Sequence, residues 1–528
     1  MTHLSRSLVL GCSVLALAAC GPEEIASPGT GGNITINNPP APAPAPAPAP
    51  TPTPTQTLVT PATGCPTITD PAGLVDEQTI TGPTGTYRVC RLPARFTRSS
   101  NLPYVPGLLY RMNGRVDVGT DGGPAPDASD GLPDTNVTLG IDPGVIIYAS
   151  GESFLNVNRG NFIDAVGTAT RPIIFTSRDN VLGLNNDTSS GQWGGVVLSG
   201  RAPVTDCVAP AATPGTVACE RQVEGTAAPA LFGGATIAGS SGTLSYVQIR
   251  FSGFTLTGGS ELQSLTTGGT QRDTVFNHIM SFNSSDDGVE FFGGYVNMKY
   301  LIVVGAEDDS IDTDTGLKAN LQYVIVVQNN NVHDALIEAD SNDLRGQIPR
   351  QDTKIANFTF IGTNTAADAG AQIFLRGGTD YTLVNGIVIS PTDQCLRIRH
   401  AETVQAADPA MDENGPPVFH SVVMQCAAPT FIGSDGSTAE SVAAIFNAGT
   451  NNNANYTPTL TNLFINGANE TAVPAFNANT LSTFFDTTTY IGAVRPGDTW
   501  YEGWTCNSVT ANFGTNNTGL CTSLPVYM

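Results

Sequence analysis

The sequence predicts an all-β fold, a right-handed parallel β-helix with a cap at each end. From about residue 137 it consists of short apolar stretches, such as VTLGI, GVIIYA and RPIIFTS, separated by turns rich in Gly, Asn and Asp. No stretch has the sustained 3.6-residue apolar period of a helix. Asp287, Asp309 and Asp334 recur after 22 and then 25 residues, each between β-rich stretches. Such a repeat is typical of a solenoid whose coils bury their apolar faces against one another.

A large β-sandwich or jelly roll is the alternative fold. It requires strands joined by tight hairpin turns, and fewer two-residue Asn-Gly or Asp-Gly turns separate the strands here than that architecture predicts. We therefore favour the β-helix.

The N-terminal segment has the pattern of a bacterial lipoprotein signal peptide. His3 and Arg6 precede a short apolar run that ends in Leu17-Ala18-Ala19-Cys20, and the run is too short to span a bilayer. Residues 1–19 are therefore predicted to be removed and Cys20 to carry the lipid. An ordinary secretory signal with a chance cysteine is the alternative. No Asp follows Cys20, which favours the outer membrane and leaves open which face carries the protein.

Residues 20–57 are predicted to form a lipidated, proline-rich tether. Prolines alternate with small residues from Pro39 to Pro54, and proline fixes φ and lacks an amide donor, so an extended polyproline II segment of about 50 Å is expected. A linker with no spacing role is the alternative.

Three further regions are predicted in the body. Residues 58–136 form an N-terminal cap, residues 137–445 form the parallel β-helix, and residues 446–528 form C-terminal coils and a cap. Trp500, Tyr501 and Trp504 are expected to seal the last coil, because an open solenoid end exposes strand edges and apolar core.

Composition restricts the partners. The 46 acidic residues outnumber the 23 basic ones, for a net charge of −23, which disfavours nucleic acid and anionic headgroups and is compatible with divalent cations. Eight cysteines remain beyond Cys12 and Cys20, and pairing between sequence neighbours is the simplest of the 105 connectivities. No Cys-x-x-Cys is present, so zinc is not expected. The predicted disulfides are Cys65–Cys90, Cys207–Cys219, Cys395–Cys426 and Cys506–Cys521.

Stacking of the coils predicts an acidic ladder. It places Asp286 and Asp287 beside Asp308 and Asp309, and Glu290 in register with Asp312. Three interpretations remain open. The carboxylates accept backbone amides in turns, or they bind calcium, which relieves their mutual repulsion, or they are catalytic. The candidate calcium ligands are Asp286, Asp287, Asp308, Asp309, Asp312 and Asp314.

The catalytic interpretation rests on a resemblance to polygalacturonases, which are right-handed β-helices. Asp287, Asp309, His333 and Arg397 follow one another in the order of that family's conserved motifs. Inverting glycoside hydrolysis needs one carboxylic acid and one carboxylate on either side of the bond. The sequence departs from the pattern, because no glycine flanks His333 and Arg399 replaces a lysine.

Three further motifs resemble a family of bacterial outer-membrane β-helix lipoproteins. They are GQWGG…GRAP, SSDDGVEFFGG and YIGA…W-x-x-GWT, spread over residues 191–505. Members of that family are largely uncharacterised and often encoded near TonB-dependent receptors. The resemblance implies a ligand-binding or accessory module at the cell envelope, with a TonB-dependent receptor or a surface glycan as candidate partner. A polysaccharide-degrading hydrolase or lyase that uses the acidic ladder is the alternative.

Aromatic residues follow the first pair of aspartates. Phe291, Phe292 and Tyr295 form either part of the core or a platform on which a sugar stacks. Core packing is the preferred interpretation.

Overall fold

The computed structural model describes residues 58–127, 131–226, 228–256, 261–329, 333–363 and 369–527. The predicted signal peptide, Cys20 and the proline-rich tether lie outside the described residues. In the part that is described, no helix is long and apolar enough to cross a membrane.

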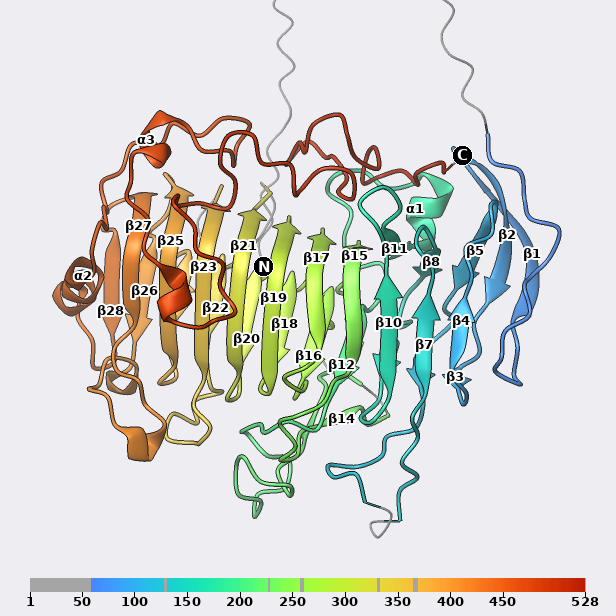
Figure 1. Cartoon of the computed structure of the whole chain (residues 1–528), viewed down its shortest axis with the longest axis horizontal. Coiled ribbons are helices and arrows are strands. Elements are labelled where there is room, and N and C mark those ends of the chain that lie inside the picture. Colours follow the sequence, from blue (N-terminus) through green and yellow to red (C-terminus); the bar gives the residue numbers. More distant parts are fainter. Residues whose placement is uncertain are drawn as a thin grey trace, which may run out of the picture. The chain divides into compact units, whose positions relative to one another are not determined.

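The fold is a parallel β-helix, as predicted, and all of its described strands except β13 and β14 form two long sheets (Figure 1). We name them the long-strand sheet and the short-strand sheet. From β15 onward, successive strands alternate between the two sheets, so that each coil contributes one strand to each. The long-strand sheet contains β1 (Val75–Gly82), β2 (Gly85–Arg91), β4 (Ser100–Leu102), β5 (Leu108–Arg111), β7 (Thr138–Ile141), β8 (Ile146–Ala149), β10 (Phe162–Val166), β11 (Ile173–Ser177), β15 (Gly242–Arg250), β17 (Val275–Phe282), β19 (Tyr295–Val304), β21 (Lys318–Val327), β23 (Asp352–Ile361), β25 (Asp380–Ser390) and β27 (Val418–Cys426). The short-strand sheet contains β3 (Arg95–Phe96), β6 (Val116–Val118), β9 (Leu155–Val157), β12 (Val196–Ser199), β16 (Leu265–Gly268), β18 (Val289–Phe292), β20 (Ile311–Asp314), β22 (Ile337–Ala339), β24 (Ile373–Leu375), β26 (Leu396–Arg399) and β28 (Phe431–Ser434).

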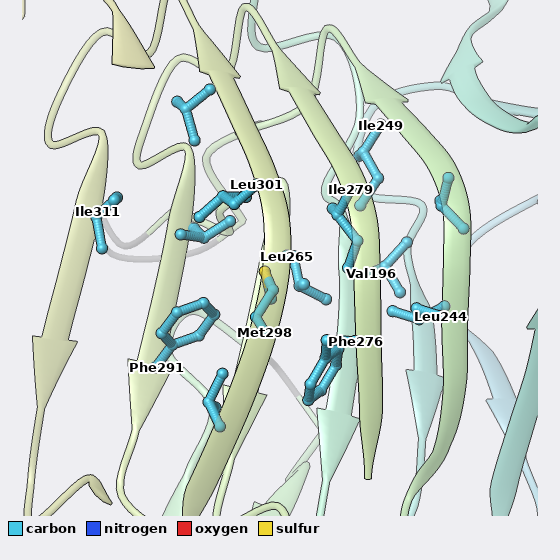
Figure 2. Packing of buried hydrophobic residues seen from close by; sticks show 14 of the residues in the cluster. Val196, Leu244, Ile249, Leu265, Phe276, Ile279, Phe291, Met298, Leu301 and Ile311 are labelled. Atoms are coloured by element: carbon cyan, nitrogen blue, oxygen red, sulfur yellow. The ribbon is translucent and has the colours of Figure 1, made fainter. Parts of the chain in front are cut away.

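The core lies between the two sheets and consists of apolar side chains stacked in register. Along the short-strand sheet, Val196, Leu265 and Val289 occupy equivalent positions on neighbouring strands, and all three are fully buried. Burial of one such side chain stabilises the fold by about 1.5–3 kcal/mol, and no coil can bury its own face alone. Figure 2 shows side chains of the two sheets facing one another, among them Leu244, Ile249, Phe276, Ile279, Met298, Leu301, Phe291 and Ile311.

Each long strand from β15 to β27 bends at one residue with positive φ. The first four of these residues are Tyr246, His278, Tyr300 and Tyr323, with φ between 52° and 64°, and they occupy equivalent positions in neighbouring coils. Their rings stack with centroids 4.1, 4.3 and 5.0 Å apart. Stacking of this kind offsets part of the cost of the left-handed backbone conformation.

Parallel coils begin earlier in the chain than the repeat suggested. β2 and β5 already pair in parallel, within the region expected to be a cap, and β1 pairs antiparallel with β2. β1 therefore covers the edge of the first coil.

The other end of the solenoid is covered by helix α2 (Ala439–Ala448). Thr438 and Ser441 form its capping box, and the Phe446 ring lies 5.4 Å from the rings of Phe419 and Phe431. Because α2 supplies the apolar cover, the prediction that Trp500, Tyr501 and Trp504 seal the last coil is wrong.

Those aromatic residues belong to a C-terminal strap, residues 449–527, that runs back along the long-strand sheet (Figure 1, dark orange to red). Trp500 and Trp504 contact the middle coils, with ring centroids 5.1 Å from Tyr300 and 5.5 Å from His278. The hydrogen bonds along the strap join Pro474 to Ser421, Tyr490 to Asn357, Thr518 to Gln248 and Tyr527 to Pro172. The strap contains the short helices α3 (Ala468–Thr471) and η3 (Ala478–Thr480).

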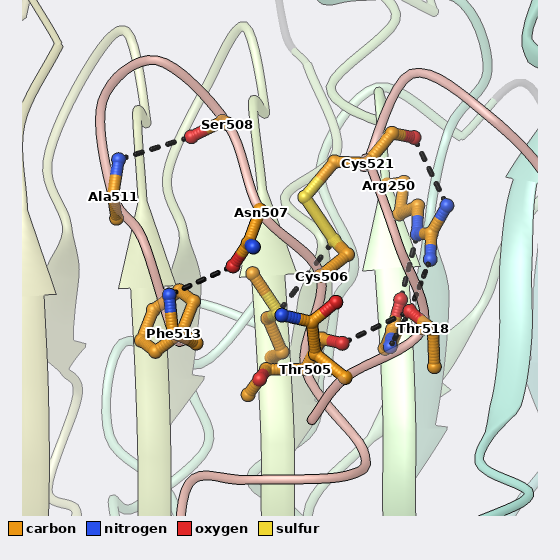
Figure 3. The surroundings of a disulfide bond; sticks show 12 residues. Arg250, Thr505, Cys506, Asn507, Ser508, Ala511, Phe513, Thr518 and Cys521 are labelled. Carbon is orange, nitrogen blue, oxygen red and sulfur yellow. Dashed lines mark hydrogen bonds between the residues drawn. A yellow bond between two sulfur atoms is a disulfide. The ribbon is translucent and has the colours of Figure 1, made fainter. Parts of the chain in front are cut away.

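Arg250 anchors the last part of the strap (Figure 3). Its fully buried guanidinium donates to the carbonyl oxygens of Cys521 and Ser523, at 2.9 and 3.0 Å, and to the side chain of Thr518. The Cys506–Cys521 disulfide closes the same segment. Burial lowers the pKa of Arg250 to about 10.

All four predicted disulfides are present, Cys65–Cys90, Cys207–Cys219, Cys395–Cys426 and Cys506–Cys521. The Cys207–Cys219 disulfide closes a loop in the long connection after β12. The same connection contains the hairpin of β13 (Arg221–Gln222) and β14 (Leu231–Phe232). The remaining short helices are α1 (Arg178–Leu182), η1 (Ala401–Thr403) and η2 (Pro409–Met411).

Candidate metal centre

Carboxylates in register line the outer face of the short-strand sheet. Glu290 on β18 lies opposite Asp312 on β20, which lies opposite Glu338 on β22. Side chains alternate between the two faces of a strand, so Val289 and Phe291 point into the core while Glu290 points outward. Neighbouring strands are about 4.8 Å apart, which brings these three carboxylates close together.

A second row of carboxylates lies in the turns that precede these strands. The Asp309 amide donates to Asp287 Oδ1 at 3.0 Å, and the Ala335 amide donates to Asp309 Oδ1 at 2.6 Å. The Ala369 amide donates to both oxygens of Asp334, at 2.8 and 3.0 Å. Each carboxylate thus binds the backbone of the following coil, as the structural interpretation of the ladder predicts.

Gly288 allows the coils to approach at this point. A Cβ atom there would lie 2.6 Å from the Ser310 carbonyl oxygen and would overlap the Val303 side chain. A residue without a side chain is therefore required directly after Asp287.

Five carboxylates of these rows, together with Asp286 and Asp308 from the same turns, form three overlapping triads. Within each triad one oxygen per residue lies within 4.8 Å of the other two. The triads are Asp286–Asp287–Asp308, Asp287–Glu290–Asp312 and Asp308–Asp309–Asp334.

Burial raises the pKa of five of the triad carboxylates. It is the largest cause for Asp287, Glu290, Asp309 and Asp312, whose pKa values lie well above the ordinary range, and neighbouring carboxylates raise them further. The pKa of Asp286 is raised to about 7 by burial and by Asp308. At neutral pH the folded triads therefore favour either bound protons or a bound cation.

Two arginines border the cluster. Arg376 pairs with Glu338 at 3.2 Å and with Asp340 at 3.1 Å, and the pKa of Glu338 remains raised because burial outweighs this pairing. Arg221 lies 3.7 Å from Asp314. The pKa of Asp314 is raised to about 7, chiefly by burial, with Arg221 opposing the shift.

Five of the six candidate calcium ligands belong to the triads. Asp314 does not; one of its oxygens accepts the Thr315 amide at 2.6 Å and the other faces Arg221. Glu290 and Asp334 complete the triads and were absent from the candidate ligand set. The repeat itself indicates Glu290, which follows Asp287 by three residues as Asp312 follows Asp309.

The candidate catalytic set is spread over several coils. Arg397 on β26 pairs in register with Phe374 on β24, which pairs with Glu338 on β22. The backbones at Arg397 and Glu338 are thus two strand spacings, or about 10 Å, apart. The Arg397 guanidinium donates to the Ala369 carbonyl at 2.7 Å and lies 4.5 Å from the centre of the Phe374 ring. His333 is buried, and its Nδ1 lies 3.0 Å from the Asp334 carbonyl oxygen. Arg376, which the sequence did not single out, pairs with Glu338 in the outer row of carboxylates.

The donor set fits a calcium ion. All groups of the central triad are carboxylates, the hard oxygen ligands that calcium prefers. Glu290 is only 6% exposed, and its Oε2 and Asp312 Oδ1 receive no hydrogen bond from the N–H or hydroxyl groups of the described residues; the carboxyls of Glu290 and Asp312 face each other. A buried carboxylate oxygen without a donor carries a large desolvation cost, which a cation bound by Asp287, Glu290 and Asp312 would remove.

These features define a parallel β-helix with an acidic outer face, and comparison with known families supports the β-helix fold. The model of the pectate-lyase-like β-helix domain matches residues 132–505, and the chain belongs to this family. Neither the curated proteins nor the solved structures gave a significant match.

Proposed function

We propose that the protein is a lipid-anchored protein of the outer membrane that binds calcium at Asp287, Glu290 and Asp312, and that it holds an acidic carbohydrate there. The observation that carries this proposal is the buried carboxylate triad, in which Glu290 Oε2 accepts no hydrogen bond from an N–H or hydroxyl group of the described residues. Membership of a pectate-lyase-like family supports a role in carbohydrate recognition.

Charge explains why a cation is needed. The chain has a net charge of −23, so a polysaccharide with carboxylate groups is repelled by most of its surface. A calcium ion takes 6–8 oxygen ligands, and three carboxylates that each bind it through one oxygen would leave positions for carboxylate or hydroxyl oxygens of a glycan. The protein side chains hold the site in place, since β18 and β20 are fixed by the stacked core.

Calorimetry of the chelator-treated protein tests the proposal. Calcium should bind the wild type, and Glu290→Gln and Asp312→Asn should each weaken binding at least tenfold. Asp164→Asn, an exposed carboxylate on β10, is the matched control and should leave calcium binding unchanged. Binding of oligogalacturonate should require calcium. Equal calcium affinity in all four proteins would refute the site.

Location and partner form a second part of the proposal. The signal-peptide pattern ending at Cys20 and the resemblance to outer-membrane β-helix lipoproteins support a lipid anchor and an accessory role beside a TonB-dependent receptor. Crosslinking in intact cells followed by affinity isolation tests this role. Recovery of one outer-membrane receptor above controls is expected. Growth of the cells with labelled fatty acid tests the anchor, and the absence of label on Cys20 would exclude it.

Polysaccharide cleavage at the same ladder is the second candidate function. The raised pKa of Asp286, about 7, would keep a carboxylic acid available as a proton donor at neutral pH. However, the nearest oxygens within a triad lie within 4.8 Å, closer than the ~6.5–9.5 Å separation of inverting hydrolases. A screen of acidic polysaccharides for shortened or unsaturated products decides the point, with Asp286→Asn as the variant expected to abolish turnover.

A further inference from the structure

The long-strand sheet carries a second candidate site on its outer face. Two cavities of about 700 and 640 Å³ lie along β17, β19, β21 and β23 and share Arg272, Asn297 and Phe484 as lining residues. They therefore form one continuous depression, which we name the lysine groove. Phe484 belongs to the C-terminal strap, so the strap forms one wall.

All three lysines of the 528-residue chain line this groove. Lys299, Lys318 and Lys354 lie on the neighbouring strands β19, β21 and β23, and between 21% and 23% of each side chain is exposed. Lysines that serve only solubility are expected to be scattered over a surface. Their restriction to three successive coils indicates a local purpose.

Each ammonium group has a carboxylate partner. Lys299 pairs with Asp486 at 2.7 Å, Lys318 pairs with Asp412 at 2.8 Å, and Lys354 pairs with Asp352. Arg272 lies beside Asp273. The four cations of the groove are thus balanced by four anions, which leaves no excess charge to attract an anion.

The paired groups still offer hydrogen bonds. An ammonium group has three donors and a carboxylate has about four acceptor positions, and one pairing uses only part of this capacity. Asn297 and Asn320 add an amide ladder, in which Asn320 Nδ2 donates to Asn297 Oδ1 at 2.8 Å. The groove therefore presents donors and acceptors side by side along several strands.

Aromatic rings complete the lining. Tyr295, Tyr300 and Phe484 border the cavities, and the Lys299 ammonium lies 5.1 Å from the centre of the Phe484 ring. Of the three aromatic residues considered from the sequence, Phe291 and Phe292 are buried, while Tyr295 is partly exposed in this groove. Such rings can pack against the apolar face of a sugar.

We infer that the lysine groove binds a neutral oligosaccharide. Adjacent donors and acceptors match the hydroxyl groups of a sugar, the aromatic rings match its C–H face, and the balanced charge disfavours an anionic ligand. Four strands at ~4.8 Å spacing span about 14 Å, enough for several sugar units. The groove lies on a different sheet from the carboxylate triads and needs no calcium, so the inference does not depend on the proposed function.

The three lysines provide the test, because a ligand in the groove should slow their reaction with an amine-reactive reagent. The full-length folded protein is acylated with and without cellohexaose, xylohexaose or maltohexaose, and the rate at each lysine is followed by mass spectrometry. We expect at least one neutral hexasaccharide to slow acylation of all three lysines at least fivefold. We also expect Lys318→Gln and Phe484→Ala to weaken its binding at least tenfold in calorimetry, with chelator present. Arg495→Gln, an exposed cation of the strap outside the groove, is the control.

Two results would overturn the inference. The first is the absence of protection by all three neutral hexasaccharides, or protection by oligogalacturonate alone. The second is neutral-sugar binding that is lost in Glu290→Gln while Lys318→Gln leaves it unchanged, because that would place the sugar at the carboxylate triads. Thermal unfolding of each variant shows whether it is folded, and the acylation of the wild type does not depend on any variant.

Discussion

Glu290→Gln is expected to stabilise the protein when calcium is absent and to destabilise it relative to the wild type when calcium is present. Glu290 shares its triad with Asp287 and Asp312, and the nearest oxygens of the three lie within 4.8 Å. Glutamine keeps the size of the side chain, removes one of three like charges, and adds an amide that can donate to the remaining carboxylates. The sign of the effect therefore reverses with the cation.

The magnitude follows from this distance. Two unit charges 4.8 Å apart repel by about 3.5 kcal/mol at an effective dielectric constant of 20 and by about 0.9 kcal/mol at 80. Glu290 takes part in two such pairs, which gives about 2–7 kcal/mol. The repulsion cannot exceed the cost of protonating Glu290, because a protonated carboxyl carries no charge. Protonation costs 1.36 kcal/mol for each pH unit above the pKa of glutamate in the unfolded chain, about 4.3, which is about 5 kcal/mol at pH 8. We therefore expect a gain of about 2–5 kcal/mol.

Urea unfolding at pH 8 measures the difference. Trp193 and Trp504 are fully buried, so tryptophan fluorescence reports the transition. With chelator, Glu290→Gln should unfold at higher urea concentration than the wild type. With calcium at 100 times its Kd, the wild type should gain about 2.7 kcal/mol and the variant much less.

A matched control separates local repulsion from net charge. Asp164→Asn removes one negative charge at an exposed position of β10 and should change stability by less than about 0.5 kcal/mol. Destabilisation by Glu290→Gln in chelator would refute the reasoning, because it would mean that the triad is held by hydrogen bonds instead of being strained by charge.

Three further outcomes follow from single residues. The pKa of Asp314 is raised from 3.8 to about 7, so between these pH values the folded protein holds a proton that the unfolded chain releases. The contribution of Asp314 to the free energy of unfolding is therefore fully present below pH 4 and falls by about 4 kcal/mol as the pH rises to 7. The difference in urea unfolding between the wild type and Asp314→Asn, followed over this pH range, measures it. Arg250→Gln leaves buried strap carbonyls without donors and should cost about 3–5 kcal/mol, with limited proteolysis cutting the strap first; an unchanged cleavage pattern would contradict the anchoring role. Gly288→Ala forces its Cβ against Val303 and the Ser310 carbonyl and should lower stability by about 1–3 kcal/mol, measured by thermal unfolding; no loss would show that the coils can separate there.

The β-helix and its disulfides could be predicted because they follow from local, repeated features. The aspartate repeat marks the coils, and the four cysteine pairs close short loops. The first coils were missed because their strands are short, as in the two residues of β3, and their spacing is irregular. The path of the strap was missed because it depends on contacts between distant residues, such as Trp504 with His278.

The carboxylate row was predicted only where the repeat is regular. Asp312 follows Asp309 by three residues, but Glu338 follows Asp334 by four, and that extra residue hides the register shown by the strands. Arg376 follows the last residue of β24, in the next coil, and reaches Glu338 through the length of its side chain. Contacts of this kind depend on side-chain conformation more than on spacing.

The grouping of the lysines shows how a solenoid can carry two chemically different surfaces. Their spacing of 19 and then 36 residues has no period, and only stacking places Lys299, Lys318 and Lys354 on one face. The inward residues are constrained by apolar ladders, while the outward residues of each sheet are free to vary. The short-strand sheet therefore gathers carboxylates that favour a cation, and the long-strand sheet gathers balanced pairs that favour hydroxyl groups. Because a packed core separates the two faces, removal of calcium should act on an acidic glycan and leave a neutral one bound.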